Sequence, residues 1–307
     1  MPKFEKIAVV GIGLIGASLA AAFKKFEPAL TITAVDRSAK SIKKAEKLGI
    51  IDRGFTEIKD NLKEQDLIFI AVPVAVIPAV IREIKEGSQN QQLLVDAGST
   101  KEEIVLQAEK ILKGTDKIFI GAHPMAGSHK SGIDWHDPDL FVDAPFILTP
   151  RLQETNKILA EEPAESGGSS LKKDSSLEFQ LLQELKALIE KIGARVHIIS
   201  AAEHDRCTAY LSHLPHLLSS ALVNLSQQQD FDSDFFQLAG SGYRDMTRIA
   251  AGSAGLWQDI ILSNRKNLAE LIQQYRAELK KLQSDLENNE QDKSYDFLAR
   301  AAEIKHK

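Results

Sequence analysis

The sequence predicts an α/β N-terminal half, with a doubly wound and mostly parallel sheet, followed by an all-α C-terminal half. From Lys6 to about Ser200, short β-branched or apolar runs alternate with longer helix-like segments, as expected when crossover helices cover both faces of a sheet. After Ser200 the strand signals disappear and apolar residues recur at helical spacing. A length of 307 residues fits two domains better than one. We therefore expect two domains, at residues 1–200 and 201–307.

Each predicted strand is a continuous apolar run, which is typical of strands buried on both faces. The predicted strands are Ile7–Val10, Thr31–Val35, Leu67–Val72, Leu93–Val95, Ile118–Ile120, Phe146–Leu148 and Val196–Ile199. The segments between them predict helices at Ile15–Phe26, Ser41–Leu48, Val74–Ile84, Lys101–Leu112 and Leu177–Ile192. Ser99 and Thr100 are expected to cap the fourth helix, whose first turn holds Glu102 and Glu103.

The stretch from Glu161 to Ser176 has almost no apolar content. It predicts an exposed, mobile loop inside the first half, and it resembles an insertion more than a linker between domains.

An apolar stripe marks the last third of the chain, where large apolar residues recur three and four positions apart. Its members are Leu268, Leu271, Ile272, Tyr275, Leu279, Leu282 and Leu286. The stripe either packs inside its own domain or pairs with a second subunit, since a helical half this small offers limited internal surface.

Composition and charge exclude several classes of function. A net charge of −5 provides no basic field for nucleic acid or an anionic membrane, so we expect neither as a partner. The one cysteine, Cys207, forms no internal disulfide and provides no cluster for a structural metal. The N-terminal apolar stretch ends at Gly11, which is too short for a membrane span and unlike a cleavable signal. We expect a cytoplasmic protein.

A glycine-rich motif follows the first predicted strand and opens the first predicted helix. In the order Gly11-Ile12-Gly13-Leu14-Ile15-Gly16, Gly11 permits a tight turn, Gly13 lets the backbone approach a pyrophosphate, and Gly16 lets helix and strand pack closely. The phosphates would then bind N–H groups of the loop and helix, including those near Leu14 and Ile15. This is the dinucleotide-binding fingerprint of the Rossmann fold.

Asp36 closes the second predicted strand, twenty residues after Gly16. A carboxylate there accepts hydrogen bonds from the adenosine ribose hydroxyls and repels a 2′-phosphate, which favours NAD as the cofactor. Arg37 follows immediately and is able to tolerate a phosphate, so NADP stays open as the alternative.

His123 follows the predicted strand Ile118–Ile120, in the run Gly121-Ala122-His123-Pro124-Met125-Ala126-Gly127-Ser128. Open α/β sheets bind their ligands at the carboxyl ends of their strands. A histidine there is able to take a proton from a hydroxyl while hydride leaves the same carbon, or it only hydrogen-bonds the turn.

Two polar segments of the helical half are further candidates. Ser212-His213-Leu214-Pro215-His216 places two histidines three residues apart around a proline, but without a cysteine or a convergent carboxylate we expect no metal there. Arg244 and Arg248 lie four residues apart on one helix face, where a guanidinium binds a substrate carboxylate or pairs with Asp245 or Asp259.

Taken in order, these segments resemble the prephenate/arogenate dehydrogenase family. The matching stretches, spread from residue 11 to about 260, are G-I-G-L-I-G-A-S, D-A-G-S-T-K, G-A-H-P-M-A-G-S, E-H-D, S-H-L-P-H, G-Y-R-D-M-T-R-I-A and W-Q-D-I. The resemblance implies a Rossmann domain followed by a helical domain that forms a homodimer. It also implies NAD-dependent oxidative decarboxylation of prephenate to 4-hydroxyphenylpyruvate, in tyrosine biosynthesis.

The resemblance also implies roles for individual residues. His123 would receive the proton of the C4 hydroxyl, assisted by Ser99 of D-A-G-S-T-K, and Arg248 would bind the ring carboxylate. The other residues implied in substrate binding are Ser212, His216, Ser128 and Trp257, the last of which would reach the neighbouring subunit's site. Some prephenate-specific members carry an acid where this chain has Ser128-His129, so arogenate remains an alternative substrate.

Two other classes of protein compete with this interpretation. A β-hydroxyacid dehydrogenase shares the architecture, but relatives of 6-phosphogluconate dehydrogenase use a catalytic lysine, and residues 203–236 contain none. A nucleotide-binding sensor without turnover would make the set of His123, Ser212, His216 and Arg248 accidental.

Overall fold

The computed structural model describes residues 4–127, 130–151, 171–228 and 235–305. The chain divides into two compact units: unit 1 comprises residues 1–207 with Ala251–Ser263, and unit 2 comprises Thr208–Ala250 with Asn264–Lys307. Unit 1 therefore includes a second, short segment, Ala251–Ser263, which lies in the sequence between the two segments of unit 2. The predicted domain boundary cuts the sequence once, between residues 200 and 201, whereas each of these units consists of two separate segments. The predicted boundary therefore stays a prediction.

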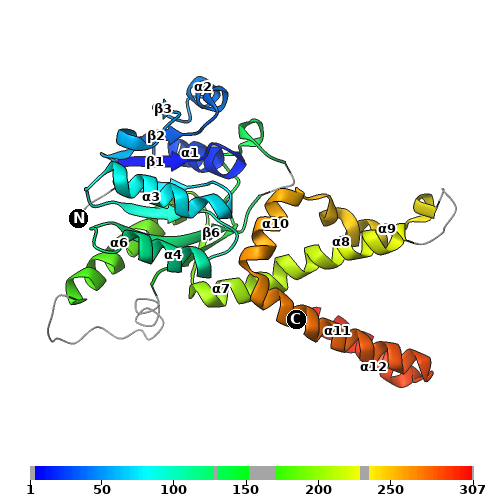
Figure 1. Cartoon of the computed structure of the whole chain (residues 1–307). Coiled ribbons are helices and arrows are strands. Elements are labelled where there is room, and N and C mark those ends of the chain that lie inside the picture. The colour runs from blue at the N-terminus through cyan, green and yellow to red at the C-terminus, as the bar shows by residue number, and fades with distance from the viewer. Residues whose placement is uncertain (1–3, 128–129, 152–170, 229–234, 306–307) are drawn as a thin grey trace. The chain divides into compact units, whose positions relative to one another are not determined.

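Unit 1 is built on one eight-stranded sheet (Figure 1). Its strands are β1 (Lys6–Val10), β2 (Thr31–Val35), β3 (Arg53–Phe55), β4 (Leu67–Ile70), β5 (Leu93–Asp96), β6 (Ile118–Pro124), β7 (Pro145–Thr149) and β8 (Arg195–Ile198). They lie in the order β3-β2-β1-β4-β5-β6-β7-β8, and every neighbouring pair is parallel except β6 with β7. The order reverses beside β1, which creates the crevice where doubly wound sheets bind ligands.

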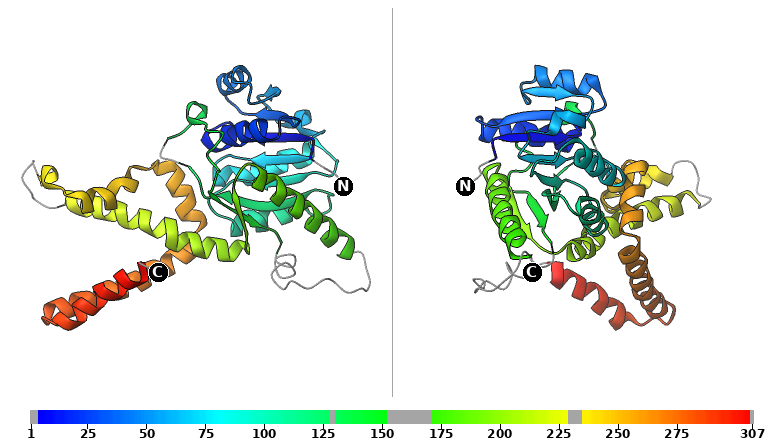
Figure 2. Two further views of the ribbon diagram at one scale, coloured as in Figure 1. Left: turned by 180° about the vertical axis from the view of Figure 1, so that it is seen from behind. Right: turned by 60° about the vertical axis from the view of Figure 1, so that its left-hand side comes forward.

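Helices cover both faces of this sheet (Figure 2). The α-helices of unit 1 are α1 (Leu14–Phe26), α2 (Ala39–Lys47), α3 (Ile77–Gly87), α4 (Glu102–Leu112), α6 (Leu171–Lys191), α7 (Ala201–Thr208) and α10 (Ala254–Ser263). Alternate residues of β1 face opposite cores: Ile7 and Val9 pack with α1 and α6, whereas Ala8 and Val10 pack with α3 and α4. The predicted α/β class with a mostly parallel sheet is confirmed.

Strand β3 was not expected from the sequence. It has three residues, Arg53, Gly54 and Phe55, and lies at the edge of the sheet beside β2. A short strand containing a charge and a glycine carries no apolar run, so periodicity cannot detect it.

The cap of α4 corrects a second expectation. Neither Ser99 nor Thr100 caps the helix, because its N-cap residue is Lys101, and the hydroxyl of Thr100 donates to Ser263 Oγ. Instead Asp205, far along the chain, accepts hydrogen bonds from the backbone N–H groups of Lys101 (2.7 Å) and Glu102 (3.0 Å). The predicted acidic first turn is present. A carboxylate from another helix thus satisfies the N–H groups that a helix N-terminus leaves unpaired.

The predicted polar loop at 161–176 lies partly outside the described residues, which exclude 152–170. Residues 171–176 are not loop, because α6 begins at Leu171, six residues before the predicted start.

Every helix or strand that the structure describes in unit 2 is a helix. Its elements are a π-helix (Ala209–His213), α8 (Leu214–Gln227), a 3-10 turn (Phe235–Leu238), α9 (Ser241–Thr247), a 3-10 turn (Arg248–Ala251), α11 (Arg265–Glu287) and α12 (Gln291–Lys305). No helix of the described chain is both long enough and apolar enough to span a bilayer.

The apolar stripe of α11 divides into two parts. Leu268 and Leu271 are buried, with 2% and 5% of their surface exposed. The members further along the helix are not buried: Ile272, Tyr275, Leu279 and Leu286 are exposed, and Leu282 is half-buried. The first part packs within this chain, while the second part presents apolar surface to its surroundings.

Candidate functional site

The glycine loop of unit 1 has the geometry that its sequence predicts. Gly11 has φ +93°, and a Cβ on it would lie 2.5 Å from the carbonyl oxygen of Ala71. A Cβ on Gly16 would lie 1.9 Å from the carbonyl oxygen of Gly11. A Cβ on Gly13, which precedes α1, would meet nothing within 4 Å. Two glycines are therefore required by the fold, whereas Gly13 leaves open space beside the helix N-terminus, where a pyrophosphate would fit.

A cleft of about 570 Å³ opens beside this loop. Gly11 and Gly13 line it together with Asp36, Arg37, Val72 and Pro73. This volume is within the usual range for small-molecule sites. Both oxygens of Asp36 are anchored by backbone N–H groups, Oδ2 by that of Ile12 (2.7 Å) and Oδ1 by that of Ser38 (2.8 Å). A carboxylate oxygen accepts more than one hydrogen bond, so Asp36 retains the capacity to bind ribose hydroxyls.

A matched pair of substitutions tests this cradle. Gly16→Ala is expected to destabilise the protein by about 1–3 kcal/mol, because the added methyl group collides with the backbone of Gly11. Gly13→Ala is expected to keep the melting temperature near wild type, because its φ of −82° and ψ of −158° suit alanine. It should nevertheless weaken dinucleotide binding about tenfold or more. Calorimetric titration and thermal melting measure both effects, and undiminished binding by Gly13→Ala would refute the cradle.

His123 lies at the carboxyl end of β6, as predicted, although the strand runs four residues further than expected. Ile118 to Ile120 pair with β5, and Gly121 to Pro124 pair with the antiparallel β7, with His123 opposite Ile147. The strand thus extends beyond the end of its parallel neighbour. This extension holds the half-buried imidazole on a rigid element at the edge where ligands bind.

The ring of His123 contacts a second histidine on α7. Its Nδ1 lies 2.9 Å from Nε2 of His204, and the two rings meet edge to face with centroids 5.1 Å apart. Nδ1 of His204 in turn lies 2.7 Å from Oδ1 of Asp205. His204 and Asp205 are fully buried, and burial lowers the pKa of His204 despite its carboxylate partner.

A buried ion pair lies beside this chain of contacts. The ammonium of Lys101 pairs with Oδ2 of Asp96, and neither side chain is exposed to solvent. Burial lowers the pKa of Lys101, and Asp96 opposes that effect. Asp96 also accepts hydrogen bonds from the backbone N–H of Gly98 (2.8 Å) and of Ala122 (3.0 Å). One carboxylate therefore fixes both the loop that leads to Ser99 and the residue before His123.

Ser99 follows β5 at the same carboxyl edge of the sheet as His123 and is half-buried. Trp257, on α10 of unit 1, is also half-buried. Ser128 lies outside the described residues. The described histidines, cysteines and carboxylates form no group of three or more that is arranged to hold a metal.

The polar residues of unit 2 lie around its π-helix. Ser212 is inside this turn, and Pro215, which lacks an N–H, lies in the first turn of the next helix. π-helical turns occur frequently at functional sites. The buried His213 anchors the turn, since its Nδ1 lies 3.0 Å from the amide nitrogen of Asn264. His216 is buried one turn later, and burial lowers its pKa, so the ring is neutral near pH 7.

Arg248 and Arg244 both lie exposed at the end of α9. In the described part of unit 2, neither arginine forms an ion pair with Asp245. Arg248 therefore presents a charged guanidinium that is not neutralised within its own helix.

Two family models match this chain in succession. The model described as "Prephenate dehydrogenase, nucleotide-binding domain" matches residues 19–162, and the model described as "Prephenate dehydrogenase, dimerization domain" matches residues 200–300. Together they cover more than half of the sequence. The chain belongs to the prephenate dehydrogenase family.

Individual relatives agree with this membership. The prephenate dehydrogenase of Lactococcus lactis subsp. cremoris is 37% identical over 90% of this chain and 69% of its own length. The solved structure of prephenate dehydrogenase from A. aeolicus, in complex with hydroxyphenyl propionate and NAD+, has a TM-score of 0.82 at 28% identity and covers 99% of this chain and 98% of its own. The arogenate dehydrogenase of Synechocystis has a TM-score of 0.77 at 28% identity, with 96% of both chains covered.

Four residues around His123 were not among the predicted site residues. Asp96, Lys101, His204 and Asp205 all lie inside the stretches D-A-G-S-T-K and E-H-D that carried the resemblance, but they were assigned no role. Their contacts join segments more than a hundred residues apart. Charged side chains inside such short motifs, next to buried runs, were the signal available in the sequence.

Proposed function

We propose that this chain catalyses the NAD-dependent oxidative decarboxylation of prephenate to 4-hydroxyphenylpyruvate, with arogenate as the alternative substrate. The observation that carries the proposal is the position of His123, whose imidazole lies at the carboxyl edge of the same sheet that carries the glycine cradle. Membership of the prephenate dehydrogenase family supports it.

The chemistry needs little from the protein beyond orientation and proton transfer. NAD, when bound, supplies the hydride acceptor for the hydrogen on C4 of prephenate. His123 takes the proton of the C4 hydroxyl, with Ser99 assisting near it, which leaves a C4 carbonyl conjugated to the ring. The C1 carboxylate then leaves as carbon dioxide, and its bonding electrons move through the ring to the C4 oxygen, which takes the proton back from His123 and becomes the 4-hydroxyl group of the aromatic product.

We assign substrate binding chiefly to the helical unit. Arg248 is the partner for the ring carboxylate, because a guanidinium binds a carboxylate through two parallel hydrogen bonds. Ser212 and His216 are assigned to the same substrate, with His216 neutral because burial lowers its pKa. Ser128 and Trp257 complete the assignment, the latter toward the neighbouring subunit's site.

Turnover on the two substrates tests the function. NADH formation, followed by its absorbance, is expected with prephenate, with release of one carbon dioxide per NADH and 4-hydroxyphenylpyruvate as the product. With arogenate we expect a lower kcat/KM. Turnover of neither substrate, with the fold intact, would refute the proposal, and preferential turnover of arogenate would replace it by the alternative.

We also propose that NAD is preferred over NADP. Asp36, Glu57 and Glu83 line the cleft beside the glycine loop, where three carboxylates oppose a 2′-phosphate. Among the described residues that line that cleft, Arg37 is the one arginine. The turnover assay repeated with NADP should therefore give a lower kcat/KM, and equal efficiency with the two cofactors would overturn the preference.

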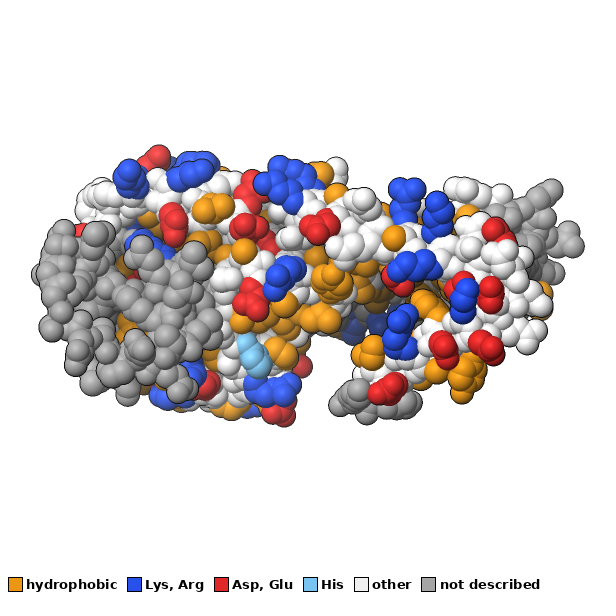
Figure 3. Space-filling model, turned by 90° about the horizontal axis from the view of Figure 1, so that it is seen from below, with side chains coloured by type: hydrophobic (Ala, Val, Ile, Leu, Met, Phe, Trp, Pro, Cys, Tyr) orange, Lys and Arg blue, Asp and Glu red, His pale blue; other side chains and the backbone are white. Residues whose placement is uncertain are grey.

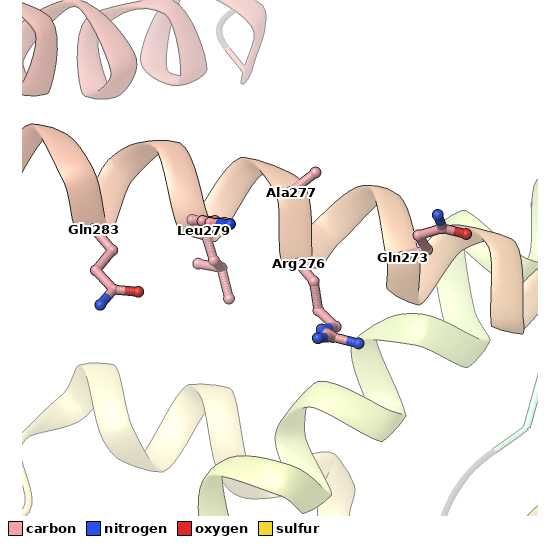
Figure 4. A pocket seen from close by; sticks show the side chains of 6 residues that line it. Gln273, Arg276, Ala277, Leu279 and Gln283 are labelled. Carbon is pink, nitrogen blue, oxygen red and sulfur yellow. The ribbon is translucent and has the colours of Figure 1, made fainter.

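The enzyme is further proposed to be a homodimer through unit 2. Gln283, Leu279 and Arg276 extend from one side of α11 into a groove of about 680 Å³ (Figure 4). Exposed apolar side chains continue along α11 and α12, including Leu286, Tyr295 and Leu298. Figure 3 shows hydrophobic side chains among the charged ones on this helical part of the chain. Exposed apolar side chains that lie side by side are typical of subunit interfaces, and the dimerization-domain model covers α11 and most of α12.

A charge on the exposed stripe tests the dimer. Leu279→Glu is expected to raise the dimer dissociation constant about 100-fold or more, because a two-fold interface would bury two unpaired carboxylates. Lys266→Glu, at an exposed position of the same helix outside the stripe, is the control. Sedimentation velocity over a range of concentrations measures both, and a wild-type protein that stays monomeric would refute the assignment.

We place the enzyme in the cytoplasm, with a small-molecule substrate and with no nucleic-acid or membrane partner. One cysteine in 307 residues and a net charge of −5 support this placement.

A further inference from the structure

The contacts of His123 form a continuous buried chain inside unit 1. His123 Nδ1 meets His204 Nε2 at 2.9 Å, and His204 Nδ1 meets Asp205 Oδ1 at 2.7 Å. His204 is 0% exposed and Asp205 1% exposed. Every hydrogen bond in such a chain needs one proton, so the position of one proton determines the others.

The proton positions follow from the Asp205 end. Asp205 accepts from the backbone N–H groups of Lys101 and Glu102 at the N-terminus of α4, so both of its oxygens act as acceptors. A carboxylate only accepts, so Nδ1 of His204 must carry the proton that they share. Burial lowers the pKa of His204, which keeps the ring neutral with an unprotonated Nε2. Nδ1 of His123 therefore donates to that nitrogen, and the lone pair of His123 lies on Nε2.

The same network fixes the backbone that carries the base. The backbone N–H of Lys101 donates to Asp205, and the ammonium of Lys101 pairs with Asp96. Asp96 also accepts a hydrogen bond from the N–H of Ala122, the residue directly before His123. The ring of His123 and its strand are thus held through one set of buried polar groups. Such networks define a single geometry when every member has its partner.

We propose that His204 and Asp205 are positioning residues of the reaction, which orient the His123 ring and hold its proton on Nδ1, so that Nε2 is the atom that takes the substrate proton. This inference rests on the proposed role of His123 as the base. The tautomer that it assigns is a property of the folded protein and can be measured without turnover.

Two substitutions of His204 separate positioning from simple packing. The amide of glutamine extends to the place of Nε2 and offers an oxygen to His123, whereas the shorter amide of asparagine reaches only the place of Nδ1. His204→Asn is therefore expected to lower kcat about 100-fold with KM changed less than threefold, and His204→Gln to recover at least tenfold of that loss. Loss of packing alone would affect both variants alike.

Asp205→Asn tests the direction in which the hydrogen bonds between His123, His204 and Asp205 run. Asparagine removes the negative charge that holds the proton on Nδ1 of His204, and its amide nitrogen must oppose either the N–H of Lys101 or that of Glu102. The proton of His204, and with it that of His123, is then no longer held on Nδ1. We expect kcat to fall about 10²–10⁴-fold, by analogy with the same replacement in the serine-protease triad. Glu203→Gln, an exposed neighbour on α7, removes the same charge outside the network and should leave kcat unchanged.

Long-range ¹⁵N–¹H NMR of the histidine rings gives the readout that is independent of activity. In wild-type protein the spectrum should assign the Nδ1–H tautomer to His123, and in His204→Asn that tautomer should lose its dominance. An Nε2–H tautomer of His123 in the wild type, or wild-type kcat in both His204→Asn and Asp205→Asn, would overturn the inference. If the wild type turns over neither prephenate nor arogenate, the proposed function fails while the NMR result still decides the tautomer.

Discussion

Replacing His123 with asparagine is expected to lower kcat about 10²–10⁴-fold while KM for prephenate changes less than threefold. The substitution removes the group that accepts the hydroxyl proton, a contribution made chiefly in the transition state. The amide side chain is similar in size and retains a polar group at the end of β6, so the fold should be unaffected. Steady-state kinetics at saturating NAD, with a thermal melt of each protein, measure the effect.

His197→Asn is the matched control for this result. His197 lies exposed on β8, a strand at the edge of the same sheet. The control should keep wild-type kcat and KM, which separates loss of the base from a general effect of removing an imidazole. If the His123 variant kept near-full turnover, another group would have to be the base.

Replacing Arg248 with alanine is expected to change KM more than kcat. KM for prephenate should rise about 10–150-fold with a smaller change in kcat, because hydrogen bonds to a charged group contribute about 1.5–3 kcal/mol of binding. Arg248 is exposed at the end of α9, so its removal leaves no buried partner and should not alter stability.

Arg244→Ala provides the comparison, since Arg244 lies one helical turn earlier and is also exposed. It should leave KM close to wild type. If Arg244→Ala raised KM and Arg248→Ala did not, Arg244 and not Arg248 would be the partner of the ring carboxylate. If both variants bound prephenate normally, the assignment of substrate binding to α9 would fall.

Much of unit 1 could be predicted because its signals are local. Buried strands such as Thr31–Val35 carry continuous apolar runs, and the glycine motif specifies its own turn, down to the open space at Gly13. The three-residue β3 could not be predicted, since its pairing with β2 depends on the neighbour and not on its own composition. The start of α6 was placed too late because its first turns are polar.

The surroundings of His123 could not be predicted in the same way. Its place at the carboxyl end of β6 follows from the order of elements. Its partner His204, however, lies on α7, 81 residues later in the sequence. Similarly, the residue that caps α4 is Asp205 and not the adjacent Thr100. Contacts of this kind depend on how elements pack, which residue spacing does not report.

The central claim is that His123 and Arg248 act on one substrate. The measurement that tests it most directly is a crystal structure of the His123→Asn variant, which should turn over slowly enough to retain prephenate, with NAD bound. We expect the amide at position 123 within hydrogen-bond reach of the C4 hydroxyl, and Arg248 paired with the ring carboxylate of the same molecule. A structure in which the two side chains face separate cavities, or in which prephenate lies away from the nicotinamide, would contradict the account.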